Sequence, residues 1–188
     1  MAQQGRGLIL PAVFAVAGTV TGSILAMLYP AWPLWQNIAF RQGMGLESLR
    51  FLHLFGLASL ALAVTAVSGL SVPGMAGAFG AVFCKGMALG AVLAGLYRNG
   101  GPGGLLTAML FVMPFALGSI VLLLFAAREA CACACWLTGA VLKRAAGEFP
   151  LKRYAIAFWM LAAIQLALTA AQYGVLRLYP AFLSCMIQ

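Results

Sequence analysis

The fold is decided by residues 83–125, FCKGMALGAVLAGLYRNGGPGGLLTAMLFVMPFALGSIVLLLF. Two apolar runs, each long enough to form a helix, flank a glycine-rich segment at residues 98–104. Clusters of Gly with Pro or Asn mark turns, so we expect a tight turn at Asn99 and Gly100 that joins two antiparallel helices. The first run also contains Lys85, a charged residue deep inside an apolar segment.

The composition of the whole chain is that of a membrane protein. Of its 188 residues, 64% are hydrophobic and 7% are charged, whereas soluble domains carry about 25% charged residues. Continuous apolar runs of about twenty residues recur, and each can cross the hydrocarbon core as a helix. The sequence therefore predicts an all-α, polytopic helical membrane protein.

Five membrane-spanning helices are predicted within a single membrane domain, residues 1–188. The first apolar run is longer than the segment of about 7–15 residues found in signal peptides, and Tyr29, Pro30 and Trp32 follow it where a cleavage site would need small residues. We therefore expect this run to be retained. Apolar residues 130–142 either extend the fourth span or lie along the membrane surface. The predicted spans are residues 8–28, 51–70, 75–97, 105–127 and 154–176.

The distribution of basic residues predicts the orientation in the membrane. The net charge is +8, and the densest basic cluster lies between the fourth and fifth spans. Cytoplasmic loops are enriched in Lys and Arg, so we expect a cytoplasmic N-terminus. We interpret the charge as setting topology and contacting anionic lipid, not nucleic acid. Residues 30–50, with Trp32 and Trp35, are predicted to lie in the membrane interface between spans one and two.

Lys85 is the most unusual residue of the predicted third span. An unpaired cation near the bilayer centre costs about 2.5–3.5 kcal/mol on insertion scales, so it should face protein or a water-lined cavity. No acidic residue is expected at its depth. Two interpretations stay open: Lys85 lines a pathway or binding site, or neighbouring helices satisfy it structurally.

Gly86, Gly90 and Ala94 form a stripe of small residues on one face of the same predicted helix. Such a stripe lets another helix backbone approach closely and drives helix association in lipid. The partner is either another helix of the same chain or a second copy, which would make a homodimer.

No catalytic residue or cofactor is predicted. Ser119 lies at a depth similar to that of Lys85, and a Ser–Lys pair can act as nucleophile and base. Helical hydroxyls more often bond to their own backbone, so we expect the protein not to be an enzyme. Cys131, Cys133 and Cys135 alternate along a predicted helix and point apart, so no metal site is expected there. The sequence holds no nucleotide-binding or metalloprotease motif.

Residues 80–177 resemble the core of the stage II sporulation protein M family. The resemblance rests on a pattern of glycines and apolar residues that includes Phe83, Lys85, Gly86, Gly90, Gly95, Asn99, Gly100, Gly104, Leu105, Leu106, Met113 and Pro114. In one respect the sequence departs from the family. Many relatives carry His or Gln and then an acidic or amide residue after the proline of the fourth span, where this chain has Phe115, Ala116 and Ser119.

The resemblance implies a sporulation protein of the cell membrane, located at the septum and the engulfing membrane. It further implies a scaffold without catalysis that recruits two cell-wall hydrolases, stage II sporulation proteins D and P, to remodel peptidoglycan during engulfment. The residues leave two alternatives open. One is a small-solute or ion transporter, or a permease half, with Lys85 lining a cavity. The other is a membrane-embedded hydrolase that uses Ser119 and Lys85.

Overall fold

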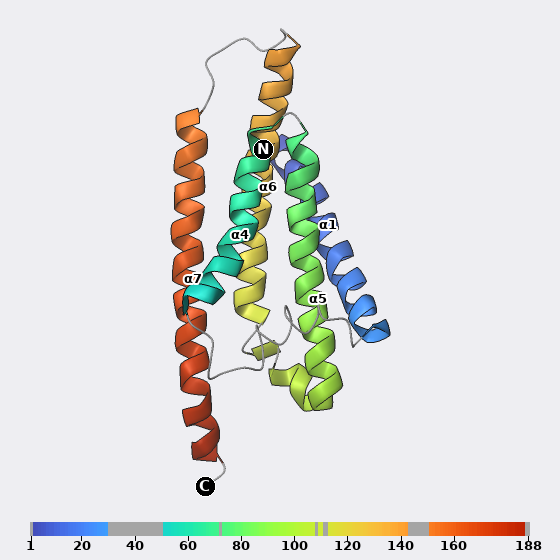
Figure 1. The fold of residues 1–188 in the computed structure, drawn as a ribbon, viewed down its shortest axis with the longest axis vertical. Helices are drawn as coiled ribbons and strands as arrows, with labels where there is room; N and C mark the ends of the chain where they lie inside the picture. Colours follow the sequence, from blue (N-terminus) through green and yellow to red (C-terminus); the bar gives the residue numbers. More distant parts are fainter. Residues whose placement is uncertain are drawn as a thin grey trace.

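The chain folds into a bundle of long helices (Figure 1). The computed structural model describes residues 2–29, 51–71, 73–107, 109–110, 113–142 and 151–186. The predicted interfacial segment at residues 30–50 lies outside these residues. The helices are α1 (Ala2–Leu28), α4 (Phe51–Gly69), α5 (Gly74–Thr107), α6 (Met113–Val141) and α7 (Leu151–Met186).

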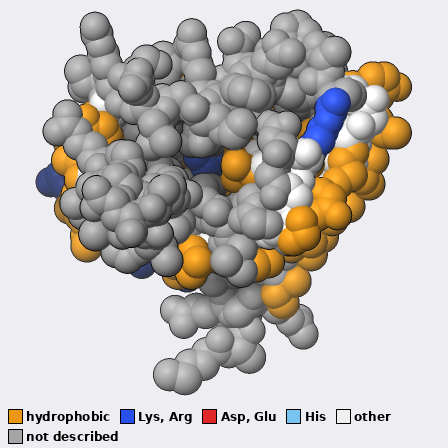
Figure 2. Space-filling view, turned by 90° about the horizontal axis from the view of Figure 1, so that it is seen from below, with side chains coloured by type: hydrophobic (Ala, Val, Ile, Leu, Met, Phe, Trp, Pro, Cys, Tyr) orange, Lys and Arg blue, Asp and Glu red, His pale blue; other side chains and the backbone are white. Residues whose placement is uncertain are grey.

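The surface of the bundle is apolar, as expected for a protein surrounded by lipid. Large hydrophobic side chains such as Val16, Val67 and Trp159 are exposed, whereas Thr65 and Thr169 are buried. Viewed from the end near the C-terminus, the described side chains on the flanks are mostly hydrophobic (Figure 2). Helices α1, α5, α6 and α7 each contain a stretch long and apolar enough to span a membrane, and α4 adds a shorter apolar helix. The prediction of a polytopic helical membrane protein with about five helices is confirmed.

Successive helices run in opposite directions along the long axis of the bundle. Helix α1 runs from the end marked N towards the opposite end, α4 returns, and α5, α6 and α7 continue the alternation (Figure 1). The two ends of the chain therefore lie at opposite ends of the bundle, as five alternating helices require. Which end faces the cytoplasm stays a prediction from the distribution of basic residues.

The predicted turn between the third and fourth spans differs from the observed one. Helix α5 continues through Asn99 and Gly100 and bends at Gly101, which has φ 54° and ψ −144°. Glycine adopts positive φ without steric cost, and Pro102 disfavours helical geometry in the residue before it. The chain then remains helical as far as Thr107, beyond the predicted turn.

The fourth span is also displaced towards the C-terminus. It was predicted at residues 105–127, whereas α6 runs from Met113 to Val141. Of the two alternatives for residues 130–142, the structure shows the extension of the fourth span. At 1.5 Å per residue a helix of 29 residues is about 43 Å long, so α6 exceeds the ~30 Å hydrocarbon core. Helix α5 was expected to end at residue 97 but continues to Thr107. Helix α6 therefore begins later in the chain than the predicted fourth span.

The closest helix contact joins α1 to α5. A Cβ atom built on Gly86 would overlap the carbonyl oxygen of Ala15, and one built on Gly90 would overlap that of Thr19. The same holds in reverse for Gly18 and Gly22 of α1, which face the backbone of α5. The small-residue stripe of α5 is therefore used within the chain, which is the first of the two alternatives weighed for it.

Polar and aromatic contacts reinforce this interface. The Ser23 hydroxyl of α1 donates a hydrogen bond of 3.1 Å to the Gly90 carbonyl oxygen of α5. The rings of Phe14 and Phe79 stack with their centroids 5.2 Å apart. Ala94, the third residue of the stripe, is buried as well. Interhelical hydrogen bonds and close packing take the place that the hydrophobic effect has in water.

Helix α6 is the centre of the bundle, because it contacts each of the other four helices. Its alanines at 126, 127 and 130 are completely buried, and Leu123 is nearly so. Small side chains on several faces let α6 accept neighbours all round. On the far side of the bundle, the Tyr154 hydroxyl of α7 donates a 2.8 Å hydrogen bond to the Ala66 carbonyl oxygen of α4.

The α1–α5 contact predicts opposite effects for two glycines of the same helix. Gly90→Ala places a Cβ against the Thr19 carbonyl oxygen, and we expect a loss of about 1–3 kcal/mol in the free energy of unfolding. Gly95 has open space around its Cβ position, so Gly95→Ala should be neutral or stabilise the helix by up to about 1 kcal/mol. Unfolding in detergent micelles measures both. Equal effects of the two substitutions would contradict the observed contact.

The Tyr154 hydrogen bond predicts a second pair of effects. Tyr154→Phe removes the bond to Ala66 while keeping the ring, and should lower the free energy of unfolding by about 1 kcal/mol. Tyr97 is exposed, so Tyr97→Phe serves as the matched control and should leave stability unchanged. If Tyr154→Phe has the stability of the wild type, this bond does not hold α7 to α4.

Candidate functional site

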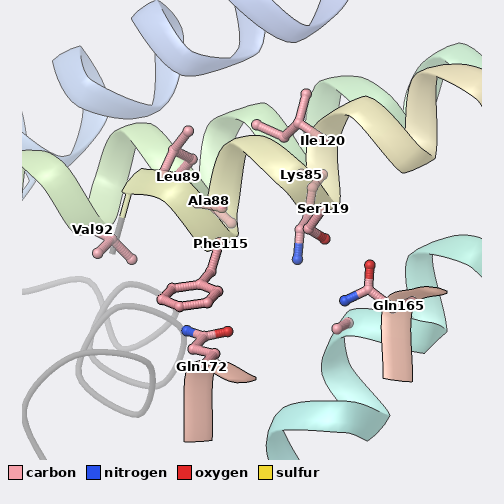
Figure 3. Close-up of a pocket in the computed structure, with 11 residues that line it drawn as sticks. Lys85, Ala88, Leu89, Val92, Phe115, Ser119, Ile120, Gln165 and Gln172 are labelled. Carbon is pink, nitrogen blue, oxygen red and sulfur yellow. The ribbon is translucent and has the colours of Figure 1, made fainter. Parts of the chain in front are cut away.

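A polar cavity lies inside the bundle, lined by residues of α4, α5, α6 and α7 (Figure 3). Its volume is about 60 Å³. Its polar lining consists of Lys85 from α5, Ser119 from α6, and Gln165 and Gln172 from α7. The remaining lining is apolar and is formed by Ala58, Ala88, Leu89, Val92, Phe115, Ala116 and Ile120.

Helix α5 packs against α1 with one face and lines the cavity with another. Gly86 and Gly90 face α1, while Lys85, Ala88 and Leu89 line the cavity from an adjacent face. The sequence predicted that Lys85 would face protein or a water-lined space, and the structure places it there. Within the described part of the chain, the Lys85 ammonium makes no hydrogen bond or ion pair. A structural partner for Lys85, the second of the two interpretations, is thus not found among those residues.

Ser119 and Lys85 meet at this cavity, as their similar depths predicted. Ser119 is buried on α6, and Figure 3 shows both side chains on the same wall of the cavity. No hydrogen bond joins them in the part of the chain that the structure describes. The structure therefore brings the two residues together without the hydrogen bond by which a lysine activates a serine nucleophile.

Gln165 carries the most informative polar group of the site. It is 3% exposed, and its Nε2 donates a hydrogen bond of 3.3 Å to Thr169 Oγ1. Its Oε1 is buried and accepts no hydrogen bond. A buried acceptor without a donor costs about 1–3 kcal/mol, so this oxygen calls for an explanation.

The sequence analysis missed Gln165 and Gln172, although a signal for them exists. Both amides lie inside the apolar run of the last span, and the reasoning applied to Lys85 extends to them, since polar side chains in spanning helices face the bundle interior. It also missed Gly18 and Gly22 of α1, which have the same spacing as Gly86 and Gly90.

Within the described part of the chain, no negative charge balances Lys85 at the cavity, because none of the described lining residues carries a carboxylate. Glu129 lines a different hollow, together with Arg128 and Arg153, further along α6. In a low-dielectric interior an uncompensated cation attracts anions strongly. The site can therefore bind a negatively charged group.

The other candidates from the sequence do not add to this site. Cys133 is buried and Cys135 exposed, so these sulfurs point apart as predicted. Cys135 Sγ lies 3.9 Å from the Met75 sulfur. Throughout the described residues, no three His, Cys, Asp or Glu side chains are placed to hold a metal ion. Asn99 and Gly100 belong to helix α5 at the far end from Lys85, and their side chains lie outside the described ones.

The chain was compared with known proteins in three ways. A scan against protein-family models, a search of curated proteins and a search of solved structures each found no match.

Proposed function

We propose that the protein is a non-catalytic membrane scaffold that recruits and localises peptidoglycan hydrolases at the septum during spore engulfment. The proposal rests on the resemblance of residues 80–177 to stage II sporulation protein M. One structural observation supports it: Gly86 and Gly90, which belong to the shared pattern, make the tight α1–α5 contact. The residues that carry the resemblance thus serve the architecture of the bundle, as expected for a scaffold.

The arrangement of the helix ends supports a docking surface at one end of the bundle. The end of α1, the bend at Gly101 and the C-terminal end of α7 all lie towards the end marked C (Figure 1). The expected orientation places this end outside the cytoplasm, where peptidoglycan hydrolases work. The proposed partners are stage II sporulation proteins D and P.

A homodimer is compatible with this function but needs a surface other than the small-residue stripe. Helix α1 covers Gly86 and Gly90, so a second copy cannot approach α5 there. The exposed apolar faces of α4 and α7 are free for such a contact within the described bundle.

The scaffold is tested by purification and by deletion. The tagged protein, solubilised in mild detergent, should co-purify with both hydrolases. Gly90→Ala should reduce this recovery in proportion to the loss of folded protein, while Gly95→Ala should not. A strain that lacks the protein should fail to thin the septal wall. Normal wall thinning and engulfment in that strain would contradict the proposal.

A second candidate function, a permease half for a small solute, is favoured by the cavity that Lys85 lines. It predicts that Lys85→Ala abolishes solute flux in proteoliposomes while the protein still assembles. Lys152 is exposed at the start of α7, so Lys152→Ala is the matched control and should transport normally. Unchanged flux in Lys85→Ala would rule out a pathway through the cavity.

A further inference from the structure

Among the described residues, the cavity presents one cation and one hydrogen-bond acceptor that lack partners. The Lys85 ammonium carries three donors and no acceptor. Gln165 Oε1 is an acceptor only, and it is buried without a donor. These groups come from α5 and α7, and both side chains are directed into the same space (Figure 3). A ligand that satisfies both must offer an acceptor or negative charge to Lys85 and an N–H or O–H to Gln165.

The orientation of the Gln165 amide is set by its neighbour on α7. The Thr169 hydroxyl donates its single proton to the Gln165 backbone carbonyl over 2.8 Å. Its oxygen can then only accept, and it accepts from Gln165 Nε2. A flipped amide would bring two acceptors together. Oε1 is therefore held away from Thr169 and remains available to a donor.

The chemistry of the lining restricts the charge of the ligand. With Lys85 on the wall and no carboxylate among the described lining residues, a cation would be repelled and a neutral molecule would leave the charge of Lys85 uncompensated. A simple halide would pair with Lys85 and leave Gln165 Oε1 without a donor. The Ser119 hydroxyl and the Gln172 amide, also on the lining, add groups that both donate and accept.

The size of the cavity restricts the ligand further. A cavity needs at least about 10–15 Å³ to hold a single water, so a cavity of about 60 Å³ has room for a small molecule of a few non-hydrogen atoms. This volume suits a small oxyanion better than a nucleotide or a sugar.

We propose that this cavity is a binding site for a small oxyanion that keeps a hydroxyl group, the class to which bicarbonate and phosphate belong. The charged oxygens lie at Lys85 and accept from Ser119, and the remaining O–H donates to Gln165 Oε1. The site is independent of a scaffold role and of translocation, because binding requires only that the bundle is folded. Binding forms and breaks no covalent bond.

Binding is measured on the full chain in detergent by titration with sodium salts at constant ionic strength and pH, following thermal stability and uptake of labelled anion. Bicarbonate or phosphate should raise the melting temperature saturably and bind at least about tenfold more tightly than chloride, nitrate or formate, which cannot donate to Gln165. Comparing the affinities for bicarbonate and phosphate shows which of the two anions the cavity prefers. Equal binding of all the anions would overturn the role of the hydroxyl, and the absence of saturable binding would overturn the site.

Two substitutions separate the two halves of the recognition. Lys85→Met should abolish saturable binding of every anion, and Lys85→Arg should retain it. Gln165→Met should remove the preference for hydroxyl-bearing anions, weakening bicarbonate or phosphate by about tenfold while leaving nitrate unchanged. Because this substitution also removes a buried oxygen without a donor, the ligand-free protein should be as stable as the wild type or more so.

Lys152→Met is the matched control, since it removes the same charge at an exposed position outside the cavity. It should bind anions as the wild type does. If Lys152→Met loses binding as completely as Lys85→Met, the anions respond to net charge and the assignment to the cavity is overturned. If Lys85→Met does not fold, the anion selectivity of Gln165→Met and the retention of anion binding in Lys85→Arg decide whether the cavity is the binding site.

Discussion

The rest of the structure depends on the backbone-to-backbone approach of α1 and α5. Gly18 and Gly22 on one helix and Gly86 and Gly90 on the other leave no room for a Cβ atom. Since apolar surface gains little from leaving lipid for protein, tight packing and interhelical hydrogen bonds must supply the association. With one face of α5 committed to α1, a neighbouring face carries Lys85 into the interior. The contact between α1 and α5 thus determines where the charge of Lys85 lies.

The buried polar groups of the bundle fall into two classes, those that find a hydrogen-bond partner in their own helix and those that do not. Thr65 and Thr169 hydrogen-bond to backbone carbonyls one turn earlier in their own helices, which satisfies them locally. Lys85 and Gln165 Oε1 find no such partner in the described part of the bundle, and both residues line one cavity. Locally satisfied hydroxyls are compatible with simple packing, whereas two unsatisfied groups of opposite character around one cavity indicate a site for a ligand.

The membrane class, the number of helices and the packing role of Gly86 and Gly90 could be predicted because hydropathy and residue size act locally. The meeting of Lys85 and Ser119 agrees with their similar predicted depths on neighbouring antiparallel helices. The bend was misplaced because Gly100, Gly101, Gly103 and Gly104 allow several positions, and only the combination of Gly101 with Pro102 selects one. Gln165 was missed because its importance lies in an unfilled hydrogen bond, which depends on the orientation set by Thr169.

The α1–α5 interface also has a consequence for how the chain is made. Ser23 and Gly90, which share a hydrogen bond across it, are 67 residues apart. Helix α1 is synthesised and enters the bilayer well before its partner exists, so its glycine face meets lipid or the insertion machinery until α5 arrives. The bundle therefore cannot assemble strictly in the order of synthesis. Its first helix waits in the membrane until α5 is made, and α6 and α7 follow later in the chain.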